Sequence, residues 1–188
     1  MPASVSWSGR APQEVTAKTA DGLKLRGYYW PPPSAGGDVI LFFHGQSGNR
    51  YKAAQMAAPL AAGGGLLVAD YRGYGDNPGA PDEAGLYKDA RAFLSLARTL
   101  APNSRIYLLG FSLGAAPALH LAGEEAVAGV ITLGAFTSLR DAAPRAARGL
   151  IRDRFDNRAA IARVDEPISH SPRSRRRRRS HRASRGVA

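Results

Sequence analysis

The chain has 188 residues, of which 44% are hydrophobic and none is cysteine, and it carries 26 basic against 15 acidic side chains. This length and composition are sufficient for one domain with a core, and they exclude a wholly disordered chain, a collagen-like chain and a disulfide scaffold. The absence of cysteine also excludes a thiol nucleophile and a cysteine-ligated zinc site.

The net charge of +11 is concentrated at the end of the chain. Residues 167–188 hold eight arginines and no acidic residue, whereas residues 1–166 hold 18 basic and 15 acidic residues. The excess of positive charge therefore belongs to the last segment and not to the folded part. We expect a folded core at 1–166 and an Arg/Ser-rich tail without regular structure at 167–188.

No apolar run approaches the roughly 18 to 20 residues that span a bilayer. The longest runs, Val39–Phe43 and Gly129–Leu133, have the length of strands. The first residues also lack the basic start and apolar stretch of a secretory signal. The sequence therefore predicts a cytoplasmic protein.

The first third of the chain predicts a hairpin followed by a βαβ unit. Residues 14–19 and 23–30 alternate apolar and polar side chains around a turn at Asp21-Gly22. The continuous apolar run Val39–Phe43 is typical of a strand buried on both faces. Asn49 is a good N-cap for a helix to about residue 62, which glycines end before a strand at 66–69.

The alternation of helices and strands continues through the middle of the chain. It predicts a helix that opens at 81–83, a strand at 105–109, a short helix at 113–122 and a strand at 127–133. This order indicates an α/β fold with a doubly wound, mostly parallel sheet and an N-terminal hairpin. Periodicity ends after Pro167, so the last strands of such a sheet are expected to be missing.

The sequence GFSLG at residues 110–114 stands between a predicted buried strand and a predicted helix. A serine with glycine two residues before and after it, in a tight strand-to-helix turn, is typical of a nucleophile elbow. The turn projects the hydroxyl from the sheet edge, where the following helix favours negative charge. Ser112 is therefore the candidate nucleophile, and Gly110 and Gly114 are the elbow glycines. The structural alternative is an ordinary glycine-rich loop.

A second glycine-rich loop, HGQSG at residues 44–48, follows the strand Val39–Phe43. Acyl transfer to serine needs two backbone N–H donors, one after the nucleophile and one from the exit loop of an earlier strand. Leu113 and Gln46 stand at those two places and are the candidate oxyanion-hole donors. The alternative is a glycine-rich turn packed over a histidine, and we interpret His44 as a structural residue.

The order of these motifs resembles the α/β-hydrolase superfamily, specifically its serine-aminopeptidase-like and lysophospholipase-like serine hydrolases. The similarity covers about residues 14–167, through TADGLKLRGYYWPP, ILFFHGQSGNR, LLVADYRGYGDNPG, GLYKDARAF, IYLLGFSLGAAPALHLA and VITLGAFTSLRDAA. It implies Ser112 as nucleophile, the N–H groups of Gln46 and Leu113 as oxyanion hole, and a small-molecule acyl substrate. It implies no metal and no organic cofactor. It also implies a structural or substrate-adjacent loop at 70–75 and a cap at 137–164.

The sequence departs from this family near its end. A serine nucleophile needs a histidine base oriented by a carboxylate, and in this fold the chain order is serine, acid, histidine. The acid-bearing segment begins as the family pattern requires at 164–168, but no acid and no predicted strand follow. Asp141 and Asp153 precede that segment and are candidates for an unusual acid. His170 and His181 are the later histidines, so the catalytic acid and histidine stay unassigned.

We interpret the segment after Pro167 as a reading-frame slip. A one-base shift, with codons that fit the printed residues, yields an Asp-Val-Val-Pro-like pattern where the resemblance requires an acid. The nucleotide sequence of the gene tests this interpretation. An immediate stop in the shifted frame, or a frame without a strand and an aspartate, contradicts it.

Three interpretations of function stay open. The first is a serine hydrolase acting on an ester, thioester or amide, weakly active or inactive if the acid and histidine are missing. The second is a protein whose Arg-rich tail binds nucleic acid or an anionic membrane in a salt-sensitive way. The third is a pseudoenzyme or truncated fragment with an open sheet edge. The sequence does not specify an oligomeric state.

Overall fold

The structure, a computed structural model, describes residues 7, 9–135, 153, 155–165 and 167–171. These residues form a sheet of seven strands in the order β1-β2-β4-β3-β5-β6-β7. The strand β2 pairs antiparallel with both β1 and β4, and the strands β3 to β7 run parallel to one another, which confirms the predicted α/β sheet with its N-terminal hairpin. The strands are β1 Gln13–Lys18, β2 Lys24–Trp30, β3 Val39–Phe43, β4 Gly65–Ala69, β5 Ile106–Phe111, β6 Gly129–Leu133 and β7 Ile168–Ser171.

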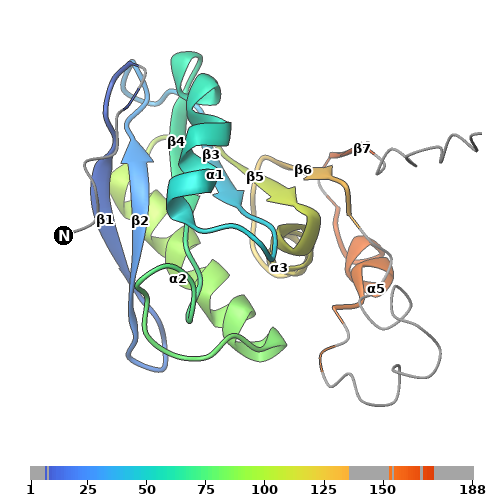
Figure 1. Ribbon diagram of the computed structural model, residues 1–188. Helices are drawn as coiled ribbons and strands as arrows, with labels where there is room; N and C mark the ends of the chain where they lie inside the picture. The colour runs from blue at the N-terminus through green and yellow to red at the C-terminus, as the bar shows by residue number, and fades with distance from the viewer. Residues whose placement is uncertain (1–6, 8, 136–152, 154, 166, 172–188) are drawn as a thin grey trace, which may run out of the picture.

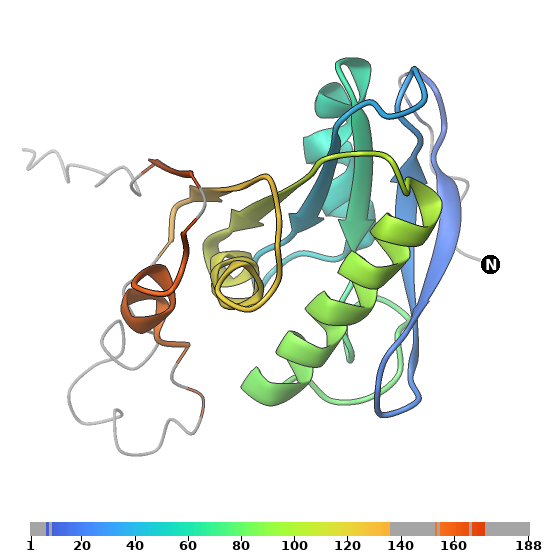
Figure 2. The same cartoon turned by 180° about the vertical axis from the view of Figure 1, so that it is seen from behind.

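Helices cover both faces of the sheet (Figures 1 and 2). The helix α1 (Arg50–Ala57) and the 3-10 turn η1 (Ala58–Ala62) lie on one face. The helices α2 (Glu83–Leu100) and α3 (Ala115–Ala122) lie on the opposite face, and α5 (Asn157–Ile161) packs beside α3. This arrangement is doubly wound, as the alternation of elements predicts.

The central strand β3 shows why a continuous apolar run was needed. Leu41 and Phe43 point into the larger core cluster under α2 and α3, whereas Phe42 between them belongs to the cluster under α1. Successive side chains of a strand point to opposite faces, so a strand covered on both faces must be apolar at every position. All three side chains are buried, and each contributes about 1.5–3 kcal/mol through removal of apolar surface from water.

Side-chain caps begin both of the helices that the sequence predicts from Asn49 and from 81–83. The Asn49 Oδ1 accepts a hydrogen bond from the Lys52 N–H at 3.1 Å, and Asp82 Oδ1 accepts one from the Gly85 N–H. Each cap satisfies an N–H group that has no partner inside its helix. The local sequence therefore fixes where α1 and α2 start.

Replacing Asp82 by alanine is expected to lower the free energy of unfolding by about 1 kcal/mol, because the first turn of α2 loses its cap. The measurement is urea unfolding followed by circular dichroism. Asp82→Asn keeps an acceptor oxygen at the same place and is the matched control. Equal losses in the two variants would contradict a capping role.

The strand β7 corrects the expectation that no strand follows Pro167. Ile168–Ser171 runs parallel to β6, with Val130 opposite Ile168, and the Val130 N–H donates to the Pro167 oxygen at 3.0 Å. An edge strand pairs through its backbone and needs no apolar alternation of side chains, which is why the sequence pattern missed it. His170 lies in this strand, whereas Asp141, His181 and residues 172–188 lie outside the described residues.

Candidate functional site

The candidate site lies where the chain leaves β3 and β5, which are neighbouring parallel strands. After β3 the chain turns to α1 on one face, and after β5 it turns to α3 on the other face (Figure 1). The crevice where connections diverge at the carboxyl ends of parallel strands is the usual ligand site of such sheets. The two sequence motifs, residues 44–48 and 110–114, therefore meet at one edge of the sheet.

The backbone at Ser112 has the conformation of an elbow. Its φ is +51°, in the left-handed region that residues other than glycine rarely adopt. A Cβ at Gly110 would lie 2.5 Å from the Ala115 Cα, and one at Gly114 would collide with the carbonyl oxygens of Phe43 and His44. Both positions therefore require glycine, and the strain at Ser112 is held by tight contact between turn, helix and neighbouring strand.

The loop at residues 44–48 lies directly against this turn. A Cβ added to Gly45 would be 3.3 Å from the Ser112 Cβ and 3.2 Å from the Phe111 Cδ1. Gln46, the next residue, borders both the cavity beside Ser112 and a smaller cavity that Leu113 also borders. The structure thus brings Ser112 close to Gln46 and Leu113, the two residues that the sequence predicts as oxyanion-hole donors.

The cavity beside Ser112 has a volume of about 390 Å³, and its wall is mainly apolar. Its lining comes from loop 44–48, from the helix α1 and from the elbow. The smaller cavity, which Gln46 also lines, has a volume of about 150 Å³. The larger cavity is lined by His44, Gly45, Gln46, Ser47, Gly48, Lys52, Ala53, Met56, Phe111, Ser112 and Gly134.

His44 is held by partners other than Ser112. Its Nδ1 lies 2.8 Å from the Gly45 oxygen, and its Nε2 lies 2.9 Å from Asp70 Oδ1, in a position only 1% exposed. The Tyr71 hydroxyl donates to the His44 oxygen at 3.1 Å. Both ring nitrogens are therefore engaged, in agreement with the interpretation of His44 as a structural residue that shapes the loop.

Arg50, which the sequence reasoning missed, is fully buried behind this loop. Its Nη1 lies 3.1 Å from Asp70 Oδ2 and also pairs with Asp76, and its guanidinium lies 4.9 Å from the centre of the Tyr51 ring. Burial disfavours the charge, but the hydrogen bonds to Asp76 and Asp70 outweigh it and raise the pKa of Arg50. A cation in the first turn of a helix is unfavourable because it faces the positive end of the helix dipole. This unusual position was the feature of the sequence that could have indicated acidic partners for Arg50.

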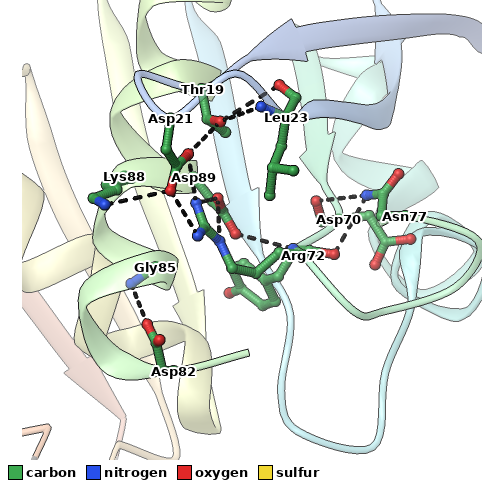
Figure 3. A network of polar contacts seen from close by, with 11 residues as sticks. Thr19, Asp21, Leu23, Asp70, Arg72, Asn77, Asp82, Gly85, Lys88 and Asp89 are labelled. Carbon is green, nitrogen blue, oxygen red and sulfur yellow. Dashed lines mark hydrogen bonds and ion pairs between the residues drawn. The ribbon is translucent and has the colours of Figure 1, made fainter. Parts of the chain in front are cut away.

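A second buried arginine anchors the loop that follows β4 (Figure 3). Arg72 donates to Asp89 on α2 from Nε at 2.9 Å and from Nη2 at 2.7 Å, and to Asp21 of the hairpin turn from Nη1 at 2.9 Å. Tyr74, two residues along the same loop, has its ring centre 5.3 Å from that of His44. The loop at 70–75 is thus tied to three parts of the fold and supports the candidate site.

Acid is expected to destabilise the fold through two carboxylates that face these arginines. The hydrogen bond from Arg72 holds the pKa of Asp21 well below its usual range, and that from Arg50 lowers the pKa of Asp76. Such carboxylates contribute stability that is present above their ordinary pKa of about 4 and is lost as pH falls below it. Burial raises the pKa of Asp89, so this carboxyl group changes the stability with pH in the opposite direction. It is one group against two.

The free energy of unfolding, from urea titrations, is therefore expected to fall between about pH 5 and about pH 3, and to fall less in Asp76→Asn. An unchanged or higher value at the lower pH would contradict this expectation.

His120 and the candidate acid Asp153 have structural contacts of their own. The His120 ring stacks on Tyr87 with centres 3.7 Å apart, and its Nε2 lies 3.2 Å from Glu124; burial lowers the pKa of this histidine. The Asp153 Oδ1 accepts a hydrogen bond from the Glu83 N–H at 3.2 Å, at the start of α2. Asp153 also borders the smaller cavity, so it is the candidate acid that the described structure brings near the site.

Comparison with known proteins gives the wider context. The model of the alpha/beta hydrolase fold family matches residues 38–166. An uncharacterized protein of Mycobacterium tuberculosis is 38% identical over 168 residues, which are 84% of this chain and 59% of the relative. The chain thus spans about three fifths of the length of that curated relative. Among the described residues, no helix has the combination of length and apolar character needed to cross a membrane.

Solved structures agree with the fold. An alpha-beta hydrolase of Vibrio vulnificus superposes with a TM-score of 0.72 at 26% identity, covering 85% of this chain and 63% of its own. An esterase of Pyrococcus furiosus gives a TM-score of 0.69 at 17% identity, covering 88% and 72%. The narrower resemblance to serine-aminopeptidase-like and lysophospholipase-like hydrolases stays a prediction. Because the matched region includes both motifs at the sheet edge and well over half of the sequence, the chain belongs to the alpha/beta hydrolase fold family.

Proposed function

We propose that this chain is the nucleophile-bearing core of a serine hydrolase that cleaves an ester, thioester or amide through an acyl-serine intermediate. The observation that carries the proposal is the strained backbone of Ser112, at φ +51° on the turn from β5 into η2 (Ser112–Gly114) and α3. A residue held in a rare conformation at the wall of a cavity is a typical arrangement for a functional group.

The reaction follows from the arrangement of the groups. Ser112 Oγ attacks the acyl carbonyl carbon, and the carbonyl oxygen becomes an oxyanion that the N–H groups of Gln46 and Leu113 stabilise. The bond from the acyl carbon to the leaving group breaks, and the leaving group departs with the proton of the serine hydroxyl. Water then hydrolyses the acyl-serine, which releases the carboxylic acid and restores the Ser112 hydroxyl. An ester is the substrate class that we place first, because the Pyrococcus furiosus protein that shares the fold is an esterase.

The chain is expected to react more slowly than an enzyme with a complete triad. His44 and His120, the two histidines whose side chains are described, are engaged with Asp70 and with Tyr87 and Glu124. An elbow and an oxyanion hole without an oriented base retain only a small part of the rate of a triad enzyme.

Labelling with a fluorophosphonate probe tests the proposal. The folded chain is expected to gain one adduct by intact mass, and peptide mapping is expected to locate the adduct on Ser112. A heat-unfolded sample is the control for nonspecific reaction. A folded chain that gains no adduct, or gains it on another residue, overturns the assignment of Ser112 as nucleophile.

A further inference from the structure

The cavity beside Ser112 has an uneven charge distribution. Among the described residues that line it, Lys52 has a positively charged side chain and no aspartate or glutamate is present. The nearby carboxylate of Asp70 is occupied by His44 and Arg50, and Asp76 is occupied by Arg50. The described wall is therefore apolar with one added positive charge.

The stability of α1 gives no reason for a lysine at this position. Lys52 lies in the first turn of α1, which has no acidic residue, and a cation there faces the positive end of the helix dipole. Arg50, in the same turn, is compensated by its two carboxylate partners. Within the described residues, the Lys52 ammonium has no ion pair and the side chain is exposed. The charge is thus locally unfavourable for the helix and available to a ligand.

The same side of α1 carries an apolar group. Met56 follows Lys52 by four residues, so the two side chains lie on one side of the helix, and both line the cavity. Met56 is 53% exposed, and Phe111, which also lines the cavity, is 38% exposed. Large apolar side chains exposed at the wall of a cavity favour an apolar portion of a ligand.

We infer that Lys52 makes this site selective for acyl substrates that combine an apolar portion with an anionic group, a carboxylate or a phosphate. The inference rests on the proposed function and names its substrate class. Lys52 contacts the anionic group while the acyl carbonyl reaches Ser112. This contact exists before and during the reaction, so it lowers KM and leaves kcat nearly unchanged.

A binding experiment tests the inference without requiring turnover. In a Ser112→Ala chain, amide chemical shifts of Gln46, Ser47 and Ala53 are followed during titration with hexanoate and with the neutral hexanamide. We expect hexanoate to bind about three- to fivefold more tightly at low ionic strength, the effect of one exposed ion pair. The preference is expected to vanish at about 0.5 M NaCl, where such a pair is screened.

Variants assign the preference to one side chain. Lys52→Met is expected to remove it, Lys52→Arg to retain it, and Lys18→Met, which removes a charge from the hairpin, to leave it unchanged. Lys52→Met is also expected to fold at least as stably as the parent chain, because the helix loses an unfavourable charge. Titration with hexyl phosphate distinguishes the two anions, since tighter binding than hexanoate identifies a phosphate ester and weaker binding a carboxylate.

A kinetic experiment separates this inference from the proposed function. The two substrates are p-nitrophenyl butyrate and the p-nitrophenyl monoester of succinate, which adds a carboxylate to the acyl group. If both substrates are hydrolysed with equal KM, and hexanoate and hexanamide bind equally, the role of Lys52 is overturned and the proposed function stands. Hydrolysis of neither, with the binding preference intact, overturns the proposed function and leaves the anion site standing.

Discussion

Replacing Ser112 by glycine is expected to abolish covalent labelling and, at the same time, to raise the free energy of unfolding. The left-handed backbone at φ +51° is unfavourable for serine by about 1–2 kcal/mol, whereas glycine adopts it without this strain. Glycine loses more chain entropy on folding, so a net gain of about 0.5–1 kcal/mol is expected. Loss of the hydroxyl removes the nucleophile, so covalent labelling at position 112 is lost.

Ser112→Ala is the matched control for this prediction. It removes the same hydroxyl but keeps a Cβ in the left-handed region, so labelling is lost and the free energy of unfolding stays close to that of the parent chain. Urea unfolding and the time course of fluorophosphonate labelling measure the two effects. If Ser112→Gly is less stable than Ser112→Ala, the backbone at this position is not strained, and the argument for an elbow fails.

Local patterns in the sequence predicted the elements that place the site. The apolar run of β3, the caps at Asn49 and Asp82 and the glycines around Ser112 each act within a few residues, so each is readable along the chain. The doubly wound sheet followed from the order of these elements, because right-handed crossovers leave few arrangements.

The buried charges that support the site could not be predicted in the same way. Arg50 and Arg72 look like surface residues in the sequence, and their partners Asp70, Asp89 and Asp21 are 17 to 51 residues away. Only the folded chain brings these groups together, and only then does pairing compensate for their removal from water. The strand β7 was missed for a related reason, since its partner β6 lies far away in the sequence and the pairing uses backbone groups.

Replacing Arg72 by methionine is expected to lower the free energy of unfolding by about 3–5 kcal/mol, because it leaves a buried carboxylate without its partner. Asp89 has no exposed surface, and it receives hydrogen bonds from the Arg72 Nε, Nη2 and backbone N–H. Lys88→Met is the matched control, because Lys88 pairs with the partly exposed Asp21 at 3.3 Å and its loss leaves no buried charge. Urea unfolding of both variants at neutral pH gives the comparison, and equal losses would contradict the prediction.

The dependence of the Arg72→Met loss on pH identifies its cause. Burial already raises the pKa of Asp89, and removal of the arginine raises it further, so the folded variant takes up a proton more readily than the unfolded chain. A raised carboxyl pKa in the folded state gives stability that is present at low pH and is lost as pH rises through it. The deficit of Arg72→Met relative to the parent chain should therefore shrink as pH is lowered toward about 4. A deficit that is constant with pH would instead assign the loss to the packing of the Arg72 side chain.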